Sequence, residues 1–128
     1  MTQDFGFAPD DPQRAERGED TIRTVLGIPA FPADSPFRAA SRDFVFSEVW
    51  SRPGLDRRAR YWITLSCACA ARSPLAIETY MRAALRSGEI TLPELREFTL
   101  QFAIFQGFPK AAEAEIILDK IANDGAED

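Results

Sequence analysis

Two polar side chains stand in apolar surroundings where they could do chemistry. Glu48 lies in the run Phe44-Val45-Phe46-Ser47-Glu48-Val49-Trp50, and a carboxylate that faces inward there suits a general acid or base. The other interpretation is that Glu48 faces solvent or pairs with a nearby arginine. Tyr80 lies in the stretch AIETYMRAAL, two residues before Arg82. A tyrosine on an apolar helix face more often packs in a core or an interface than takes part in catalysis.

The chain contains no histidine, which excludes Ser-His-Asp and Cys-His arrangements for nucleophilic catalysis. The absence of histidine and of any close cysteine-acid cluster also leaves zinc and iron without an obvious ligand set. Glycine-rich phosphate loops are missing as well. We therefore expect no metal site.

Cys67 and Cys69 are separated by one residue in the middle of an expected helix. Positions i and i+2 lie about 200° apart around a helix axis, so the two sulfurs point to opposite sides. A redox pair on a helix usually has two intervening residues and begins at the helix N-terminus. The pattern favours two free thiols in a core over redox chemistry.

Four arginines crowd around the Pro53-Gly54 turn: Arg52, Arg57, Arg58 and Arg60. The pattern is typical of a solvated helix start. It also suits a site for carboxylates, because the guanidinium fork matches a carboxylate.

The elements that must position these residues are helical. A helical pattern over residues 13–26 stops at Gly27, and Asp34-Ser35-Pro36 begins a second helix that must end before Pro53. Asp56 is the next expected cap, and it precedes a helix that is apolar or small on all sides from Tyr61 to Ala71. We therefore expect that helix to be central and buried.

Three further helices follow. Ser73-Pro74 begins one that Gly88 should close in a left-handed conformation, and Thr91-Leu92-Pro93-Glu94 has the form of a capping box. The last helix begins at Pro109 and runs to about Asn123. No segment alternates with a two-residue period, so the sequence predicts an all-α fold of about six helices.

Length and composition limit the classes of protein. The 128 residues, 45% of them hydrophobic, predict one globular domain over residues 13–123 between a mobile arm (1–12) and an acidic tail (124–128). The net charge of −5 disfavours nucleic-acid binding. No apolar run could span a membrane and no signal peptide is present, so we expect a cytoplasmic protein. Ten phenylalanines favour an additional buried surface between subunits.

Three ordered stretches resemble the carboxymuconolactone decarboxylase family, which belongs with the AhpD-like alkylhydroperoxidases. They are the strings EVWSRPGLDRRAR (48–60), MRAALRSG (81–88) and QGFP (106–109). The resemblance covers about residues 16–123. It implies an AhpD-like orthogonal helical fold that assembles as a homo-trimer or homo-hexamer. It also implies a lyase of aromatic catabolism that removes carbon dioxide from a carboxylated lactone without a cofactor.

The resemblance also implies roles for individual residues. Tyr80 stands where the family has its usual histidine, and it could serve as a proton donor. Glu48 matches an acidic position of the family and could be the remaining acid/base. Arg52 and Arg82 would hold substrate carboxylates, and Trp50 would also bind the substrate.

Three functions remain open at this point. The first is an enzyme that decarboxylates or isomerises a carboxylated lactone or a related ring-cleavage dicarboxylate. The second is an AhpD-like thiol peroxidase (peroxiredoxin activity) that uses Cys67 or Cys69. The third is a non-catalytic helical oligomer that binds a small molecule.

Overall fold

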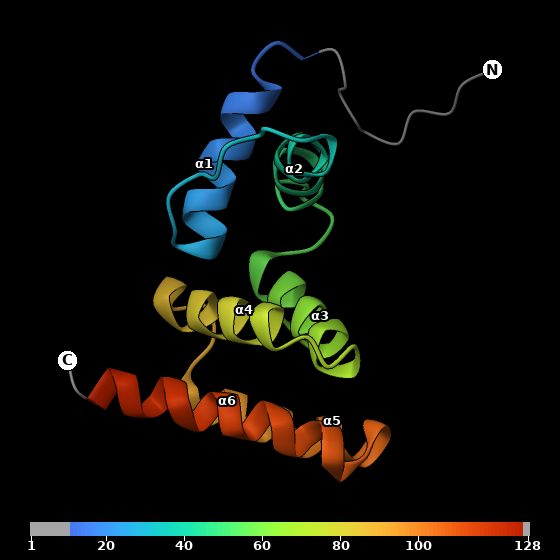
Figure 1. The fold of residues 1–128 in the computed structure, drawn as a ribbon, viewed down its shortest axis with the longest axis vertical. Coiled ribbons are helices and arrows are strands. Elements are labelled where there is room, and N and C mark those ends of the chain that lie inside the picture. The colour runs from blue at the N-terminus through green and yellow to red at the C-terminus, as the bar shows by residue number, and fades with distance from the viewer. Residues whose placement is uncertain (1–10, 127–128) are drawn as a thin grey trace. The chain divides into compact units, whose positions relative to one another are not determined.

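The computed structural model describes residues 11–126 and divides the chain into two compact units, residues 1–55 (unit 1) and 56–128 (unit 2). Figure 1 shows the helices of both units. Residues 11–126 form helices and no strand, so the expected all-α class is confirmed for this part of the chain. Most of the expected N-terminal arm and the last two residues of the expected tail lie outside the described residues.

Unit 1 holds α1 (Arg14–Leu26), the short helix α2 (Pro36–Ala40) and the π-helix η1 (Ser41–Val49). The residues predicted to end and to cap these helices do so. Gly27 ends α1 with a φ of 66°, and the Ser35 hydroxyl accepts the Arg38 N–H at 3.1 Å as the N-cap of α2. α1, blue in Figure 1, packs against η1, which directly follows the teal α2.

The segment from Pro36 to Val49 differs from a uniform α-helix. After α2 the backbone bonds widen to a five-residue spacing, as in the 2.9 Å bond from the Trp50 N–H to the Val45 carbonyl. Side-chain spacing in the sequence is compatible with a helix of either kind, so it did not reveal the change. π-turns often occur at functional sites.

Gly18 is where α1 and η1 approach most closely. A Cβ atom built on Gly18 would lie 2.1 Å from the Arg42 carbonyl oxygen, which is inside van der Waals contact. Only glycine therefore fits at this crossing. The same two helices carry buried apolar residues of unit 1: Ile22, Val25, Leu26 and Phe46.

Unit 2 holds α3 (Arg57–Ala70), α4 (Pro74–Ser87), α5 (Leu92–Gln106) and α6 (Phe108–Ala126). Asp56 caps α3 by accepting the Ala59 N–H at 2.7 Å, and Thr91 and Glu94 form the complete capping box of α5. Gly88 ends α4 with a φ of 79°. α6 continues beyond its expected end at Asn123.

The core of unit 2 forms where α3 packs on α4, α5 on α6, and α6 against α3 and α4. Its fully buried side chains include Leu65, Ile77, Met81, Leu95 and Leu118. The expectation that α3 is buried on all sides was wrong. Ile63, Ser66 and Cys67 lie on an exposed face, because small and apolar residues around the whole helix do not show which face the neighbouring helices cover.

Candidate functional site

Glu48 lies on the inner side of the π-helix η1. Three consecutive residues of this helix, Phe46, Ser47 and Glu48, are all buried. Glu48 as a whole is 6% exposed, and Ser47 is fully buried. A buried carboxylate on a π-helix is an unusual feature, and it gives the candidate site its centre.

The carboxylate of Glu48 contacts Arg14 at the start of α1. Glu48 Oε1 lies 2.7 Å from Arg14 Nε, and the two side chains are 4% and 24% exposed. Neither atom has a hydrogen-bond partner within the described range, so the pair is a contact of opposite charges without good hydrogen-bond geometry. The sequence suggested pairing with a nearby arginine, but the partner lies 34 residues earlier in the chain.

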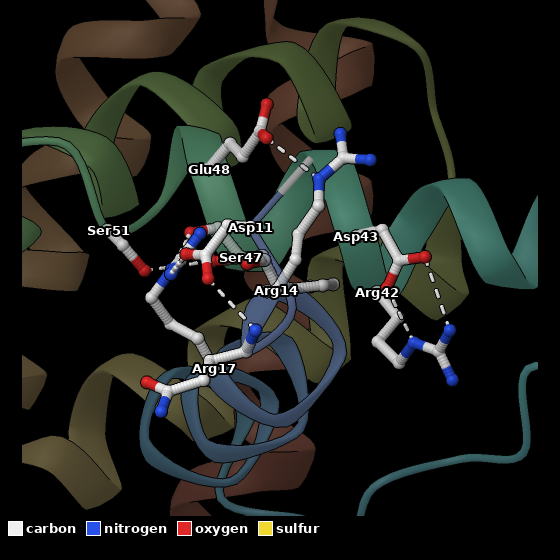
Figure 2. A network of polar contacts seen from close by, with 10 residues as sticks. Asp11, Arg14, Arg17, Arg42, Asp43, Ser47, Glu48 and Ser51 are labelled. Atoms are coloured by element: carbon white, nitrogen blue, oxygen red, sulfur yellow. Dashed lines mark hydrogen bonds and ion pairs between the residues drawn. The ribbon is translucent and has the colours of Figure 1, made fainter. Parts of the chain in front are cut away.

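A second polar group lies one turn further along α1. Arg17 Nη1 donates to Asp11 Oδ2 at 2.5 Å, and Arg17 Nε donates to the Ser47 carbonyl at 3.0 Å. The Ser51 hydroxyl donates to the Phe46 carbonyl at 3.0 Å. Figure 2 shows Asp11, Arg17, Ser47 and Ser51 gathered on one side of the network, while Glu48 reaches Arg14 and Arg42 holds Asp43 elsewhere.

These groups border a cavity of about 480 Å³ in unit 1. The cavity brings Glu48 and Arg52 together, two residues to which the sequence assigned roles. Its lining residues are Asp11, Arg17, Ser47, Glu48, Ser51, Arg52 and Pro53. Two guanidinium groups and two carboxylates at one cavity suit the binding of a charged, carboxylate-bearing molecule.

Trp50, expected at the substrate, is 7% exposed and stacks on Phe46 with ring centroids 6.4 Å apart. The contact makes the indole part of the apolar packing of η1. Among the residues that line the cavity, Trp50 does not appear.

Tyr80 belongs to α4 of unit 2 and is half-buried. Burial raises the pKa of its phenol above the usual value, and the neighbouring Tyr61 of α3 raises it further. Tyr61 is fully buried, and burial raises its pKa as well. Both phenols therefore stay protonated at neutral pH, which makes Tyr80 a proton donor rather than a base.

Arg82 lies two residues after Tyr80, so its side chain points to another side of α4. Its guanidinium donates to Glu78 at 3.0 Å and to Asp124 of α6 at 2.5 Å. Lys120 completes the group with a 3.0 Å contact to Glu78. Two carboxylates of the chain already occupy Arg82, at the surface between α4 and α6.

The arginines around the Pro53-Gly54 turn belong to both units. Arg52 lies at the cavity of unit 1, whereas Arg58 belongs to unit 2 and supports the capping box of α5. Its guanidinium bonds the Glu94 carboxylate and the Glu89 carbonyl, and it lies 5.6 Å from the centre of the Trp62 ring. Arg58 holds the pKa of Glu94 down at about 2.

The two cysteines lie on opposite sides of α3, as their spacing predicted. Cys67 is exposed and Cys69 is buried, so the expectation of two core thiols is correct only for Cys69. Burial raises the pKa of the Cys69 thiol to about 11, which leaves almost no thiolate at neutral pH. Neither thiol is in a disulfide.

Residues 11–126 contain neither a metal-binding cluster nor a membrane-spanning helix. No group of three or more Cys, Asp or Glu side chains in this range is arranged to hold a metal ion. No helix in the same range is both long and apolar enough to cross a membrane.

No protein-family model matches the chain. Two curated proteins are similar to it. One is nitrosuccinic acid decarboxylase npaB of Metarhizium robertsii, 34% identical over 95 residues that cover 74% of this chain and 66% of that protein. The other is 4-carboxymuconolactone decarboxylase of Acinetobacter baylyi, 28% identical over 124 residues that cover 89% of this chain and 90% of that protein. The chain belongs to the carboxymuconolactone decarboxylase family. The first match spans about two thirds of that relative's length.

Sequence reasoning missed Arg14, Arg17, Asp11 and Ser47. A signal was present for the first two, because arginines three residues apart lie on one face of a helix. No local pattern shows that this face meets η1. The roles assigned from the sequence to Glu48, Arg52, Tyr80, Arg82 and Trp50 stay predictions.

Proposed function

We propose that this chain is a decarboxylase that acts without a cofactor on a small substrate with more than one carboxylate, as its place in the carboxymuconolactone decarboxylase family suggests. The observation that carries the proposal is the cavity of unit 1, where the buried Glu48 shares a lining with Arg17 and Arg52. Both similar proteins are named as decarboxylases of such acids. Aromatic catabolism is one source of such a substrate.

The chemistry needs no electron acceptor beyond the substrate itself. In nitrosuccinic acid a nitro group, and in 4-carboxymuconolactone an unsaturated lactone, can accept the electron pair of the carbon–carbon bond that breaks. Carbon dioxide leaves when that bond breaks, and a proton then adds to the carbon atom that carried the carboxylate. The enzyme must hold the remaining carboxylate and supply the proton.

The residues divide these tasks as follows. Arg52 holds a substrate carboxylate in the proposal, because a guanidinium group matches a carboxylate with two parallel hydrogen bonds. Glu48 is the acid/base group. For Tyr80, which belongs to unit 2, the proposal keeps the role of proton donor that the family resemblance implies, and a phenol that stays protonated at neutral pH fits that role. Arg82 has the weakest support, because Glu78 and Asp124 already occupy it.

The test is turnover of 4-carboxymuconolactone and of nitrosuccinate, followed by carbon dioxide release together with the change in ultraviolet absorption. Glu48→Gln should lower kcat by a factor of about 10²–10⁴, the usual contribution of a positioned acid or base. Tyr80→Phe should lower it as well. Glu97→Gln, which changes an exposed carboxylate of α5, is the matched control and should leave turnover unchanged.

Three outcomes count against the proposal. The first is that neither compound turns over, and the second is that Glu48→Gln keeps full activity. The third is an absorption change without carbon dioxide release, which would make the enzyme an isomerase. A thiol peroxidase has no supporting observation, since Cys69 is held as a thiol and the two sulfurs point apart.

The proposal includes a homo-oligomer, trimer or hexamer. It is supported by apolar side chains of α5 and α6 that are more than half exposed: Leu100, Ile104, Phe105, Phe108 and Ile116. Several of them border an apolar groove of about 490 Å³. Light scattering after size-exclusion chromatography measures the assembly, and a monomer at micromolar concentration would contradict this part.

A further inference from the structure

The cavity of unit 1 is lined by a carboxylate that belongs to the chain. Asp11 precedes α1, and its Oδ2 accepts a hydrogen bond from Arg17 Nη1 at 2.5 Å. Its other oxygen accepts the Gln13 N–H at 2.9 Å. The hydrogen bond from Arg17 holds the pKa of Asp11 below its usual value, so Asp11 is an anion at neutral pH. A guanidinium at this cavity is therefore already paired with a carboxylate.

Ser47 lines the same cavity, and its hydroxyl has no hydrogen-bond partner among residues 11–126. Ser47 is fully buried, and its Oγ makes no hydrogen bond to any residue in the described part of the chain. Leaving a buried hydroxyl unpaired costs about 1–3 kcal/mol, so such groups usually meet a ligand or an ordered water. The carbonyl of the same residue accepts the Arg17 Nε hydrogen. Ser47 and Arg17 therefore meet at this cavity.

We propose that Arg17 is a carboxylate-binding residue of this cavity, and that one carboxylate of a small dicarboxylate replaces Asp11 on its guanidinium and accepts a hydrogen bond from Ser47. Asp11 is then an internal competitor of the ligand. The exchange is balanced in charge, since one carboxylate leaves the guanidinium as another arrives. The position of Asp11 ahead of the first helix lets its side chain rotate away without unwinding α1.

The choice of a dicarboxylate follows from the second guanidinium. Arg52 lines the same cavity, so a ligand with two carboxylates can contact Arg17 and Arg52 together. The cavity of about 480 Å³ lies in the ordinary range for small-molecule sites. This inference deepens the proposed function and rests on it for the substrate class, while the binding step can be measured separately.

The probe is succinate, a dicarboxylate with no group that could accept electrons, titrated into the full chain by calorimetry. Asp11→Asn removes the competing charge but keeps an oxygen for the Gln13 N–H. It should bind succinate about two- to five-fold more tightly, as expected for loss of a partly exposed ion pair. Arg17→Gln should bind at least tenfold more weakly, and Ser47→Ala a few-fold more weakly. Propionate, with one carboxylate, should bind more weakly than succinate.

Asp34→Asn is the matched control, because it removes a carboxylate of unit 1 from an exposed arginine pair, the 3.0 Å contact with Arg38. It should leave succinate affinity unchanged. A gain in affinity cannot come from misfolding, so Asp11→Asn decides the question even if Arg17→Gln fails to fold. Unchanged or weaker binding in Asp11→Asn overturns the proposal, and so does unchanged binding in a folded Arg17→Gln.

The two proposals fail in different ways. Succinate binding that depends on Arg17, without turnover of any substrate, overturns the decarboxylase and leaves the binding site intact. Turnover with succinate binding that does not depend on Arg17 overturns the binding site and leaves the decarboxylase intact.

Discussion

Ser47 of unit 1 and Thr99 of unit 2 are both buried hydroxyls on helices, but their surroundings differ. Thr99 donates to the Glu115 carboxylate of α6, and its oxygen lies 2.9 Å from the Arg96 carbonyl. Within the described residues, Ser47 Oγ has no partner, and the adjacent Glu48 contacts Arg14 without a well-formed hydrogen bond. Thr99 is therefore a polar group that stabilises the fold, whereas Ser47 and Glu48 line a cavity with polar atoms that can bind a ligand.

The difference extends to the helices themselves. In unit 2 the α-helices begin at capping side chains or prolines, and α5 has a complete capping box. In unit 1 the polar residues lie on a π-helix that crosses α1 at a glycine. Natural proteins break such local rules mainly at functional sites, where the cost in stability is offset elsewhere. The irregular helix geometry therefore favours unit 1 as the location of a functional site.

The largest expected effect concerns the Arg14–Glu48 pair. Arg14→Met leaves the Glu48 carboxylate buried without a counter-charge and should lower the free energy of unfolding by about 3–5 kcal/mol. Adding Glu48→Leu should recover most of the loss, since an apolar pair replaces a buried ionic one. Urea unfolding measures both.

Arg23→Met is the control for Arg14→Met. Arg23 lies on the same helix and forms only exposed contacts with Glu19 and Asp20, so its loss should cost less than about 1 kcal/mol. If Arg14→Met costs no more than Arg23→Met, the pair is no more important to unit 1 than a surface contact.

A smaller effect is expected at the crossing of α1 and η1. Gly18→Ala puts a methyl group against the Arg42 carbonyl and should lower the free energy of unfolding by about 1–3 kcal/mol. Gly125→Ala, in α6 with open space around it, should instead raise stability by up to about 1 kcal/mol. Thermal melts of the two variants should therefore shift in opposite directions, and shifts in the same direction would disprove the close approach.

The smallest effect concerns the two buried hydroxyls, Ser47 and Thr99. Thr99→Ala removes a satisfied hydroxyl and should cost about 1 kcal/mol of unfolding free energy. Ser47→Ala removes an unsatisfied hydroxyl together with its desolvation cost, so it should raise the free energy of unfolding by up to about 1 kcal/mol, while it weakens succinate binding. Equal losses of stability in both variants would show that Ser47 has a structural partner after all.

The helix boundaries could be predicted because the signals are local. Ser35, Asp56 and Thr91 each accept a backbone N–H within three residues, and Gly27 and Gly88 have positive φ as their positions indicated. Such contacts depend on the neighbouring residues alone. The family resemblance could likewise be read from contiguous strings of residues.

The candidate site was predicted only in part, because most of its contacts are not local. The buried environment of Glu48 and the presence of Arg52 could be inferred from their neighbours in the chain. The partners of the site come from α1, and they join η1 across about thirty residues, as in the bond from Arg17 to Ser47. No periodicity identifies which arginine meets which carboxylate.

The π-helix η1 has a consequence for how this protein can be compared with others. A π-turn is, in effect, one residue inserted into an α-helix, so losing one residue between Ser41 and Ser47 would restore α-helical bonding. The residues after the deletion would keep their order in the sequence. Ser47 and Glu48 would nevertheless rotate by about 100° around the helix axis relative to α1. An alignment would record a single gap and an intact glutamate. A relative could therefore keep Ser47, Glu48 and the arginines of α1 and still lack the site, which makes the number of residues in this helix as informative as their identities.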